Sequence, residues 1–359
     1  MRRLRTYNQT KLKAVMTWLL ALTLLWTSSS AFAHTQDSDG SAVALVYHRF
    51  GENDVPSTNV RIEQFEAQIA ALKTGGHVFL KSDELVSRLK NNEAIPDKTV
   101  IITADDAYKS IATEAWPRLK AAGIPLTVFV STDAVDEGRR RYLTWDAIRA
   151  LAADGVIIAQ HSKRHLHMTE AGVEATRADI NAASKRFIAE LGFAPKIIAY
   201  PYGEYNEIIR ALIIEMGFDA AFAQYSSVIH NSSDRYSLPR FPVNERYSDP
   251  ERFALVTNAK ALKVKNVTPL YPVLAAQHNP PLYGFSLNKD QTDLKNLNCF
   301  ASHTNKATEI IRLSVDRIEV RFDAAFPYGR NRINCTAPAG DGRWYWLGKF
   351  FYIPGGPLD

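Results

Sequence analysis

Short apolar runs and longer amphipathic segments alternate along the first two thirds of the chain. The runs are rich in β-branched residues, as in V-I-I-T-A-D-D at residues 100–106. A run that is apolar on both faces is typical of a strand buried in a parallel sheet. The pattern predicts strands within residues 42–50, 100–106, 125–132, 156–162, 197–203, 218–224 and 236–243.

The segments between these runs carry apolar residues at helical spacing. They predict helices over residues 63–73, 110–122, 144–153, 170–191 and 206–216. Strands that alternate with helices form right-handed βαβ units and a parallel sheet. About seven units in roughly 210 residues favour a (β/α)7-like distorted barrel over an open sheet, although spacing alone leaves the closure of the barrel open.

The pattern changes near residue 263. Short runs such as R-I-E-V-R-F and R-W-Y-W-L-G-K-F-F-Y-I are separated by Gly, Pro, Asn and Asp. Short apolar runs separated by turn residues predict a small all-β, sandwich-like domain over residues 263–359. Its dense aromatic residues favour core packing, with stacking on sugar rings as the alternative. The α/β domain that precedes it is predicted to occupy residues 34–255.

The first 33 residues are typical of a secretory signal peptide. Five basic residues precede an apolar core at residues 14–27, and Ala31-Phe32-Ala33 forms a small-x-small cleavage site. The core is too short for an ordinary membrane span, so no stable span is expected after cleavage, and an uncleaved anchor is the less favoured reading. The protein is therefore expected to be exported, to a periplasm or to the medium.

Removal of this segment also changes the charge. The whole chain has 43 basic and 38 acidic residues, a formal net charge of +5. The five basic residues of residues 1–33 account for that excess, so the mature chain is neutral. No arginine-rich run or basic patch is apparent, and no nucleic-acid partner is expected. No protein partner is indicated.

Both cysteines of the chain, Cys299 and Cys335, lie in the predicted β domain. An oxidising compartment and an even count favour a disulfide between them. Two buried free thiols are the alternative.

Polar residues gather where the predicted strands end. His48, the adjacent Asp105 and Asp106, His161 and Tyr202 each follow an apolar run. The carboxyl ends of the strands are the face on which β/α barrels keep their chemistry. A turn or helix cap would account for the two aspartates alone, but the recurrence of polar strand ends favours a site.

His161 and His165 are spaced at i and i+4, so on a helical turn they would face the same way. Two histidines with a carboxylate give three protein ligands with open positions, the pattern of a hydrolytic metal site. His167 lies close by, and chance spacing of surface histidines is the competing explanation.

Three motifs resemble those of the polysaccharide deacetylases, the carbohydrate esterase family 4 built on the NodB-like domain. Residues 103–107 (T-A-D-D-A) are similar to its T-F-D-D-G motif, residues 161–165 match H-S/T-x-x-H, and residues 201–203 match P-Y-G. The resemblance covers about residues 43–250. It implies that Asp105 is the general base, that Asp106, His161 and His165 hold a divalent metal, expected to be zinc, and that the backbone N–H of Tyr202 helps to bind the oxyanion.

The chain departs from the family pattern in several places. Ala104 and Ala107 replace the usual Phe and Gly, and the arginine usually found before P-Y-G is missing. Arg240 is the candidate to hold the base carboxylate in its place. No L-x-x-H follows Arg240, but residues 45–48 (L-V-Y-H) resemble the early strand of the circularly permuted branch, which includes poly-β-1,6-N-acetylglucosamine deacetylases. That resemblance implies that His48 is the general acid; His230 is the rival.

The resulting prediction is a metal-dependent hydrolase that removes N-acetyl groups from an exported, N-acetylglucosamine-containing polysaccharide. An O-acetyl glycan esterase, or a peptidoglycan or chitin deacetylase, is the alternative enzyme. A carbohydrate-binding protein on an inactive deacetylase scaffold is the non-enzymatic alternative. The partner expected in each case is an acetylated polysaccharide.

Overall fold

The computed structural model describes residues 40–357, apart from residues 292, 293, 295 and 305. The predicted signal peptide lies outside these residues and stays a prediction. Among the described residues, no helix combines the length and the apolar character needed to cross a bilayer.

A parallel sheet forms the larger part of the fold, and its order is β10-β1-β5-β6-β7-β8-β9, with β4 paired to β5. Every strand pair in it is parallel. The strands are β1 (Ala42–Tyr47), β4 (Val78–Phe79), β5 (Thr99–Ala104), β6 (Thr127–Val130), β7 (Ile157–Gln160), β8 (Ile197–Ala199), β9 (Ala220–Phe222) and β10 (Phe241–Pro242). β1 and β5 are buried along their whole length, as their apolar runs predict.

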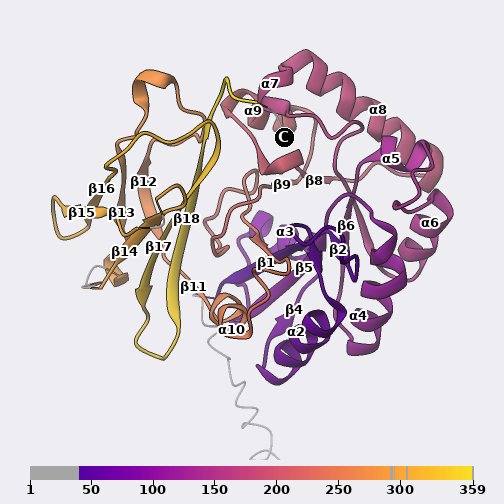
Figure 1. Cartoon of the computed structure of the whole chain (residues 1–359), viewed down its shortest axis with the longest axis horizontal. Coiled ribbons are helices and arrows are strands. Elements are labelled where there is room, and N and C mark those ends of the chain that lie inside the picture. Colours follow the sequence, from indigo (N-terminus) through magenta and orange to yellow (C-terminus); the bar gives the residue numbers. More distant parts are fainter. Residues whose placement is uncertain (1–39, 292–293, 295, 305, 358–359) are drawn as a thin grey trace, which may run out of the picture. The chain divides into compact units, whose positions relative to one another are not determined.

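Helices flank this sheet, and Figure 1 shows α4, α6 and α8 along its outer side. They are α2 (Ile62–Thr74), α3 (Ser82–Asn91), α4 (Trp116–Ala122), α5 (Thr132–Asp136), α6 (Trp145–Ala153), α7 (Met168–Ala171), α8 (Val173–Leu191), α9 (Glu207–Glu215) and α10 (Pro250–Thr257). A π-helical turn, η1 (Ile111–Ala115), precedes α4, and a short pair of strands, β2 (Arg49–Phe50) and β3 (Asn59–Val60), follows β1. The distorted NodB-like barrel is confirmed as the fold class.

Helix boundaries follow local capping chemistry. The Thr144 side chain accepts a hydrogen bond from the Ala147 N–H at the start of α6, and Gly123 ends α4 in the left-handed conformation. The single helix predicted for residues 170–191 is wrong, because Gly172 (φ 82°, ψ 173°) breaks it into α7 and α8. The pattern also missed α3, α5 and α10.

The last hundred residues form two four-stranded sheets, β11-β18-β17-β14 and β12-β13-β16-β15. Their strands are β11 (Lys260–Ala261), β12 (Val264–Thr268), β13 (Tyr283–Leu287), β14 (Asn298–Ala301), β15 (Glu309–Arg312), β16 (Arg317–Arg321), β17 (Gly329–Pro338) and β18 (Trp344–Ile353). Side chains from both sheets, including Phe285, Ile333 and Phe351, form one apolar core. The predicted sandwich is confirmed.

The predicted Cys299–Cys335 disulfide is confirmed, and its cysteines face each other in register on β14 and β17. Both residues are fully buried in the core of the sandwich. The disulfide therefore ties one sheet edge to its centre across a loop of 36 residues.

The sandwich packs directly against the barrel. Phe350 and Tyr352 of β18 belong to the same apolar cluster as Ile198 and Tyr200 at the end of β8. At Gly348 the backbones meet so closely that a Cβ atom would lie 1.8 Å from the Ser226 carbonyl oxygen. These contacts join both parts in one compact unit, while the predicted boundaries at residues 255 and 263 remain a prediction.

Candidate active site

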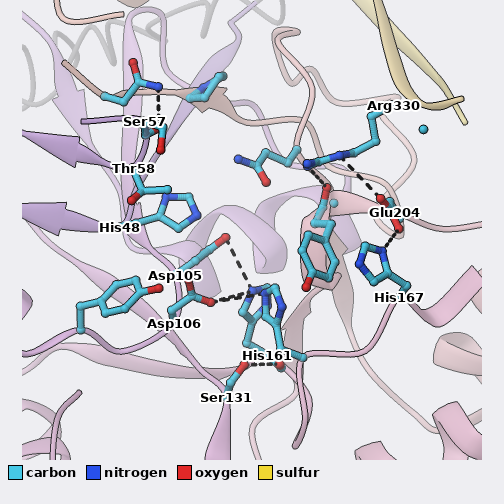
Figure 2. Close-up of a pocket in the computed structure, with 18 of the residues that line it drawn as sticks. His48, Ser57, Thr58, Asp105, Asp106, Ser131, His161, His167, Glu204 and Arg330 are labelled. Carbon is cyan, nitrogen blue, oxygen red and sulfur yellow. Dashed lines mark hydrogen bonds and ion pairs between the residues drawn. The ribbon is translucent and has the colours of Figure 1, made fainter. Parts of the chain in front are cut away.

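The polar residues that follow the strands converge on one cavity of about 1650 Å³. His48 follows β1, Asp105 and Asp106 follow β5, His161 follows β7 and Tyr202 follows β8. Figure 2 shows His48, the two aspartates and His161 directed toward the same space. The expectation that the carboxyl ends of the strands form a common site is thus met in the geometry.

Asp105 is buried and is held by Arg240, which directly precedes β10. The Arg240 Nη1 and Nη2 atoms donate to the two carboxylate oxygens at 2.6 and 2.8 Å. Arg240 has no exposed surface, and its Nε donates to the Ala223 carbonyl at 3.0 Å. Burial raises the pKa of Asp105, but the charge and hydrogen bonds of Arg240, together with the nearby His161 and His48, outweigh burial and lower the pKa to about 2.

Asp106 turns away from its neighbour because the chain leaves β5 in a left-handed turn. Asp106 and Ala107 have φ values of 70° and 59°. Glycine adopts such a conformation without a Cβ clash, which is the physical reason for the glycine that the family motif has at the position of Ala107. The turn separates the acids: Asp105 faces Arg240, and Asp106 faces the two histidines.

The loop from His161 to His165 is irregular, so the helical turn expected for these histidines is wrong. Ser162 and His165 have φ values of 64° and 57°. The buried carboxylate of Asp179 on α8 shapes the loop by accepting hydrogen bonds from the backbone N–H groups of Lys163 (2.8 Å) and Arg164 (3.3 Å). The two imidazole rings still meet, with 4.8 Å between their centroids.

Asp106, His161 and His165 form a compact donor set. One ligand atom from each lies within 4.8 Å of the others. The Asp106 Oδ1 atom is 3.6 Å from the His161 Nε2 atom and 3.4 Å from the His165 Nε2 atom. The His161 Nδ1 atom lies 2.8 Å from the Ala199 carbonyl oxygen, which can only accept, so Nδ1 carries the proton and Nε2 presents its lone pair.

Burial lowers the pKa of both His161 and His165 to about 4, so both rings are neutral near pH 7. Two neutral imidazoles and one carboxylate with open space beside them suit a divalent ion of the zinc type. The donor set therefore fits the metal that the sequence predicted.

Tyr202 has an unusual backbone for a bulky residue, with φ 58° and ψ 0°. Its ring stacks on His167, with 3.7 Å between the centroids and an interplanar angle of 8°, and His165 contacts it edge-on. Gly203 follows with φ 73°, where a Cβ atom would lie 2.4 Å from Gln224. Contacts on both sides therefore hold the Pro201–Gly203 turn (η2) at the cavity.

The two candidate acids lie at opposite ends of β1. His48 follows the last residue of the strand and lines the cavity. Ile229, next to His230, bridges to Ala42 at the first residue of the strand. A six-residue strand spans roughly 20 Å, and His230 is not among the residues that line the cavity. The geometry therefore favours His48 over His230.

Sequence reasoning missed Glu204, Arg330 and Asp179. Glu204 is buried beside the P-Y-G turn, and its carboxylate oxygen lies 2.9 Å from the His167 Nδ1 atom. His167 therefore pairs with Glu204 and is not one of the three clustered ligands. Arg330 reaches the same turn from β17 of the sandwich. The position of Glu204 next to P-Y-G is a usable signal, whereas nothing in the sequence around Arg330 indicates the contact.

Residues 92–221 match the family model for polysaccharide deacetylase. The Staphylococcus aureus poly-β-1,6-N-acetyl-D-glucosamine N-deacetylase is 25% identical over 233 residues, which are 58% of this chain and 80% of that protein. Among solved structures, the Streptococcus pyogenes deacetylase PplD in complex with acetate aligns with a TM-score of 0.56 at 21% identity, covering 61% of this chain and 99% of that one. IcaB from Ammonifex degensii aligns with a TM-score of 0.53 at 23% identity, covering 62% of this chain and 98% of that one.

The barrel with its acid pair and histidine pair defines a carbohydrate-active hydrolase. The chain contains a polysaccharide deacetylase domain, which the family model matches over residues 92–221, and the solved deacetylases share its fold. His48 and Arg240 lie outside the segment that the family model matches, so their roles depend on the geometry described above.

Proposed function

We propose that this protein is a metal-dependent N-deacetylase of an exported polysaccharide that contains N-acetylglucosamine. The observation that carries the proposal is that a candidate general base and a candidate metal-binding set lie side by side in one cavity. An ionised, arginine-held Asp105 lies beside the Asp106–His161–His165 donor set, with a 3.9 Å separation between the Asp105 Oδ2 and His161 Nε2 atoms. A fixed carboxylate next to a metal-binding set is the arrangement needed to hydrolyse an amide with water.

Asp106, His161 and His165 would hold the ion, with zinc as the preferred metal because of the two imidazoles. When bound, such an ion supplies Lewis-acid polarisation of the acetamide carbonyl and makes a nearby water more acidic. The hydrogen bond from His161 Nδ1 to the Ala199 carbonyl keeps the ligating nitrogen directed at this position.

Asp105 is the proposed general base. Its ion pair with Arg240 keeps the carboxylate ionised and fixes its orientation, so it can accept a proton from the attacking water. The bidentate contact leaves little rotational freedom, which places the accepting oxygen in advance of the reaction.

The backbone N–H of Tyr202 is the proposed oxyanion donor. It lies in a turn that neighbouring rings hold in the left-handed region. A donor that is fixed before the reaction needs no reorganisation when negative charge develops on the carbonyl oxygen, and the loss of one such donor costs about 3–4 kcal/mol in comparable enzymes.

His48 is the proposed general acid, because an amine leaves an amide only when it is protonated. It projects from the end of β1 into the cavity next to Asp105 (Figure 2). An imidazole can carry a proton and release it to a leaving amine, which is the chemistry this role needs.

Three observations support a polymeric amide substrate. The cavity of about 1650 Å³ exceeds the roughly 300–1,000 Å³ of a site for one small ligand. The relative from Staphylococcus aureus is named for N-deacetylation of a poly-N-acetylglucosamine. The disulfide and the predicted signal peptide at residues 1–33 support export, with residues 34–255 as the proposed catalytic domain and residues 263–359 as the proposed β domain.

The deciding experiment measures acetate release from a panel of acetylated glycans, before and after dialysis against a chelator. We expect release from N-acetylglucosamine polymers, its loss after chelation, and its recovery with zinc. Release only from O-acetylated xylan would replace the proposal with the esterase alternative. Binding to the glycans without any release of acetate would support an inactive scaffold.

A further inference from the structure

Arg330 belongs to the sandwich but contacts the catalytic face of the barrel. It lies on β17, and its Nη1 donates to the Tyr202 carbonyl oxygen at 2.9 Å. Its Nε atom lies 3.6 Å from the Oε1 atom of Glu204, an ion pair shown in Figure 2. One guanidinium thus contacts Tyr202 within P-Y-G and Glu204 directly after it.

The turn that Arg330 contacts is conformationally costly. A left-handed Tyr202 is disfavoured by roughly 1–2 kcal/mol relative to an ordinary conformation, and such a residue persists only where its surroundings hold it. A hydrogen bond to the Tyr202 carbonyl fixes the peptide that follows Tyr202, while the Tyr202 N–H belongs to the peptide that precedes it. The two peptides are linked through the φ and ψ angles of Tyr202, so the hydrogen bond restrains the left-handed conformation that orients the N–H. The contact from Arg330 therefore acts on the orientation of the proposed oxyanion donor.

Glu204 gives Arg330 a fixed position. Its side chain is 3% exposed and also pairs with His167, whose ring stacks on Tyr202. The backbone of Arg330 is in register with Tyr352 of β18, and the Tyr352 hydroxyl donates to Glu170 of α7 at 2.9 Å. The sandwich is thus anchored to the barrel on both strands at this point.

We propose that Arg330 is a positioning residue for the deacetylase reaction: the C-terminal sandwich uses it to hold the Tyr202 backbone in the left-handed conformation that orients the proposed oxyanion donor. This inference rests on the proposed function. It makes the β domain a functional part of the catalytic unit, in addition to its role in packing against the barrel.

The chain offers a matched control in Arg343, which directly precedes β18. Its guanidinium also contacts one carboxylate and one backbone carbonyl of the barrel: Asp97 at 2.7 and 3.0 Å, and Asn258 at 2.7 Å. None of these three residues lines the cavity. Arg343→Ala therefore removes an equivalent link between sandwich and barrel without touching the P-Y-G turn.

The experiment compares wild type, Arg330→Ala, Arg330→Lys and Arg343→Ala for acetate release, zinc content and urea unfolding. It also measures the affinity of each protein for a phosphonamidate analogue of the acetamide. In Arg330→Ala we expect kcat to fall about 10- to 100-fold with KM changed less than about 3-fold, because a displaced oxyanion donor acts on the transition state. The affinity for the tetrahedral analogue should fall by a similar factor, and zinc content should stay unchanged.

Arg330→Lys should recover part of the rate, because an ammonium keeps a charge beside Glu204 but lacks the fork of the guanidinium. Arg343→Ala should stay within about 3-fold of wild type. The inference would be overturned if kcat fell equally in Arg330→Ala and Arg343→Ala. It would also be overturned if Arg330→Ala left kcat unchanged or affected only KM. If wild type itself releases no acetate, the proposed function fails, which separates that failure from this one.

Discussion

Replacement of Arg240 by methionine tests the central ion pair of the site. Methionine fills a similar volume but removes the charge and both hydrogen bonds to Asp105. Arg240 and Asp105 are 0% and 2% exposed at their side chains, so water cannot replace the lost partner. The Asp105 carboxylate would then be buried without its counter-charge.

The expected loss of stability in Arg240→Met follows from the burial of the ion pair and from the pKa of Asp105. Breaking a buried pair by removing one partner costs about 3–5 kcal/mol of unfolding free energy. The lowering of the Asp105 pKa from 3.8 to about 2 corresponds to roughly 2 kcal/mol of unfolding free energy at neutral pH. Because the folded pKa lies below the unfolded one, this stabilisation is present above pH 4 and is lost as the pH falls through about 2.

In Arg240→Met the burial of Asp105 remains while the opposing charge is gone, so the pKa of Asp105 should rise above its ordinary value. The stability deficit relative to wild type should therefore be largest near pH 7 and should shrink by pH 3, where the variant carries a protonated Asp105. The acid limb of the activity profile should move upward in pH for the same reason.

The assay is urea unfolding at pH 7 and pH 3, with Arg210→Met as the control. Arg210 also makes a bidentate contact with an aspartate, Asp234, at 2.7 and 2.8 Å, but their side chains are 26% and 38% exposed. We expect that control to lose less than about 1 kcal/mol. The reasoning is refuted if both variants lose the same stability at pH 7, or if the Arg240→Met deficit does not depend on pH.

Three further outcomes are expected. His161→Ala should reduce the zinc content of the purified protein below the wild-type value, and equal content by metal analysis would contradict the ligand assignment. His48→Ala should lower the hydrolysis rate of an acetamide substrate about 10²–10⁴-fold and that of an activated aryl acetate much less, whereas Asp105→Asn should lower both rates. Equal loss of activity on the two substrates in His48→Ala would contradict its role as the acid. Reduction of the Cys299–Cys335 disulfide, which closes a loop of 36 residues, should lower the unfolding free energy by about 2–4 kcal/mol in urea titrations, and an unchanged midpoint would contradict this.

The strands of the parallel sheet and the face of the candidate site could be predicted because parallel strands carry a clear local signal. β1 and β5 are continuous apolar runs that end in polar residues, and their carboxyl ends must meet at one edge of the sheet. Helix boundaries with a strong cap, such as Thr144 for α6, were also readable. The break at Gly172 was not, because an amphipathic pattern continues across it and only the backbone conformation of the glycine reveals the interruption.

The clustering of Asp106, His161 and His165 was predicted, but for a wrong local reason. His161 and His165 do not lie on a helical turn. The loop between them takes its shape from Asp179, which lies 14 residues beyond His165 on α8 and supplies acceptors to two backbone N–H groups. The spacing of the histidines therefore identified the residues, while the conformation that brings their rings together depends on a tertiary contact that spacing does not encode.

The same limit applies more strongly to Arg330, which is separated from Tyr202 by 128 residues. Arg240 could be proposed from sequence because the arginine expected to pair with Asp105 was missing from its usual place and another arginine had to take over that contact. Nothing comparable pointed to Arg330, since a backbone carbonyl accepts from any donor and leaves no trace in the residue type. Contacts to backbone groups across domains are thus the hardest part of a site to predict from sequence. Here such a contact restrains the backbone of Tyr202, the residue whose N–H the proposed chemistry requires.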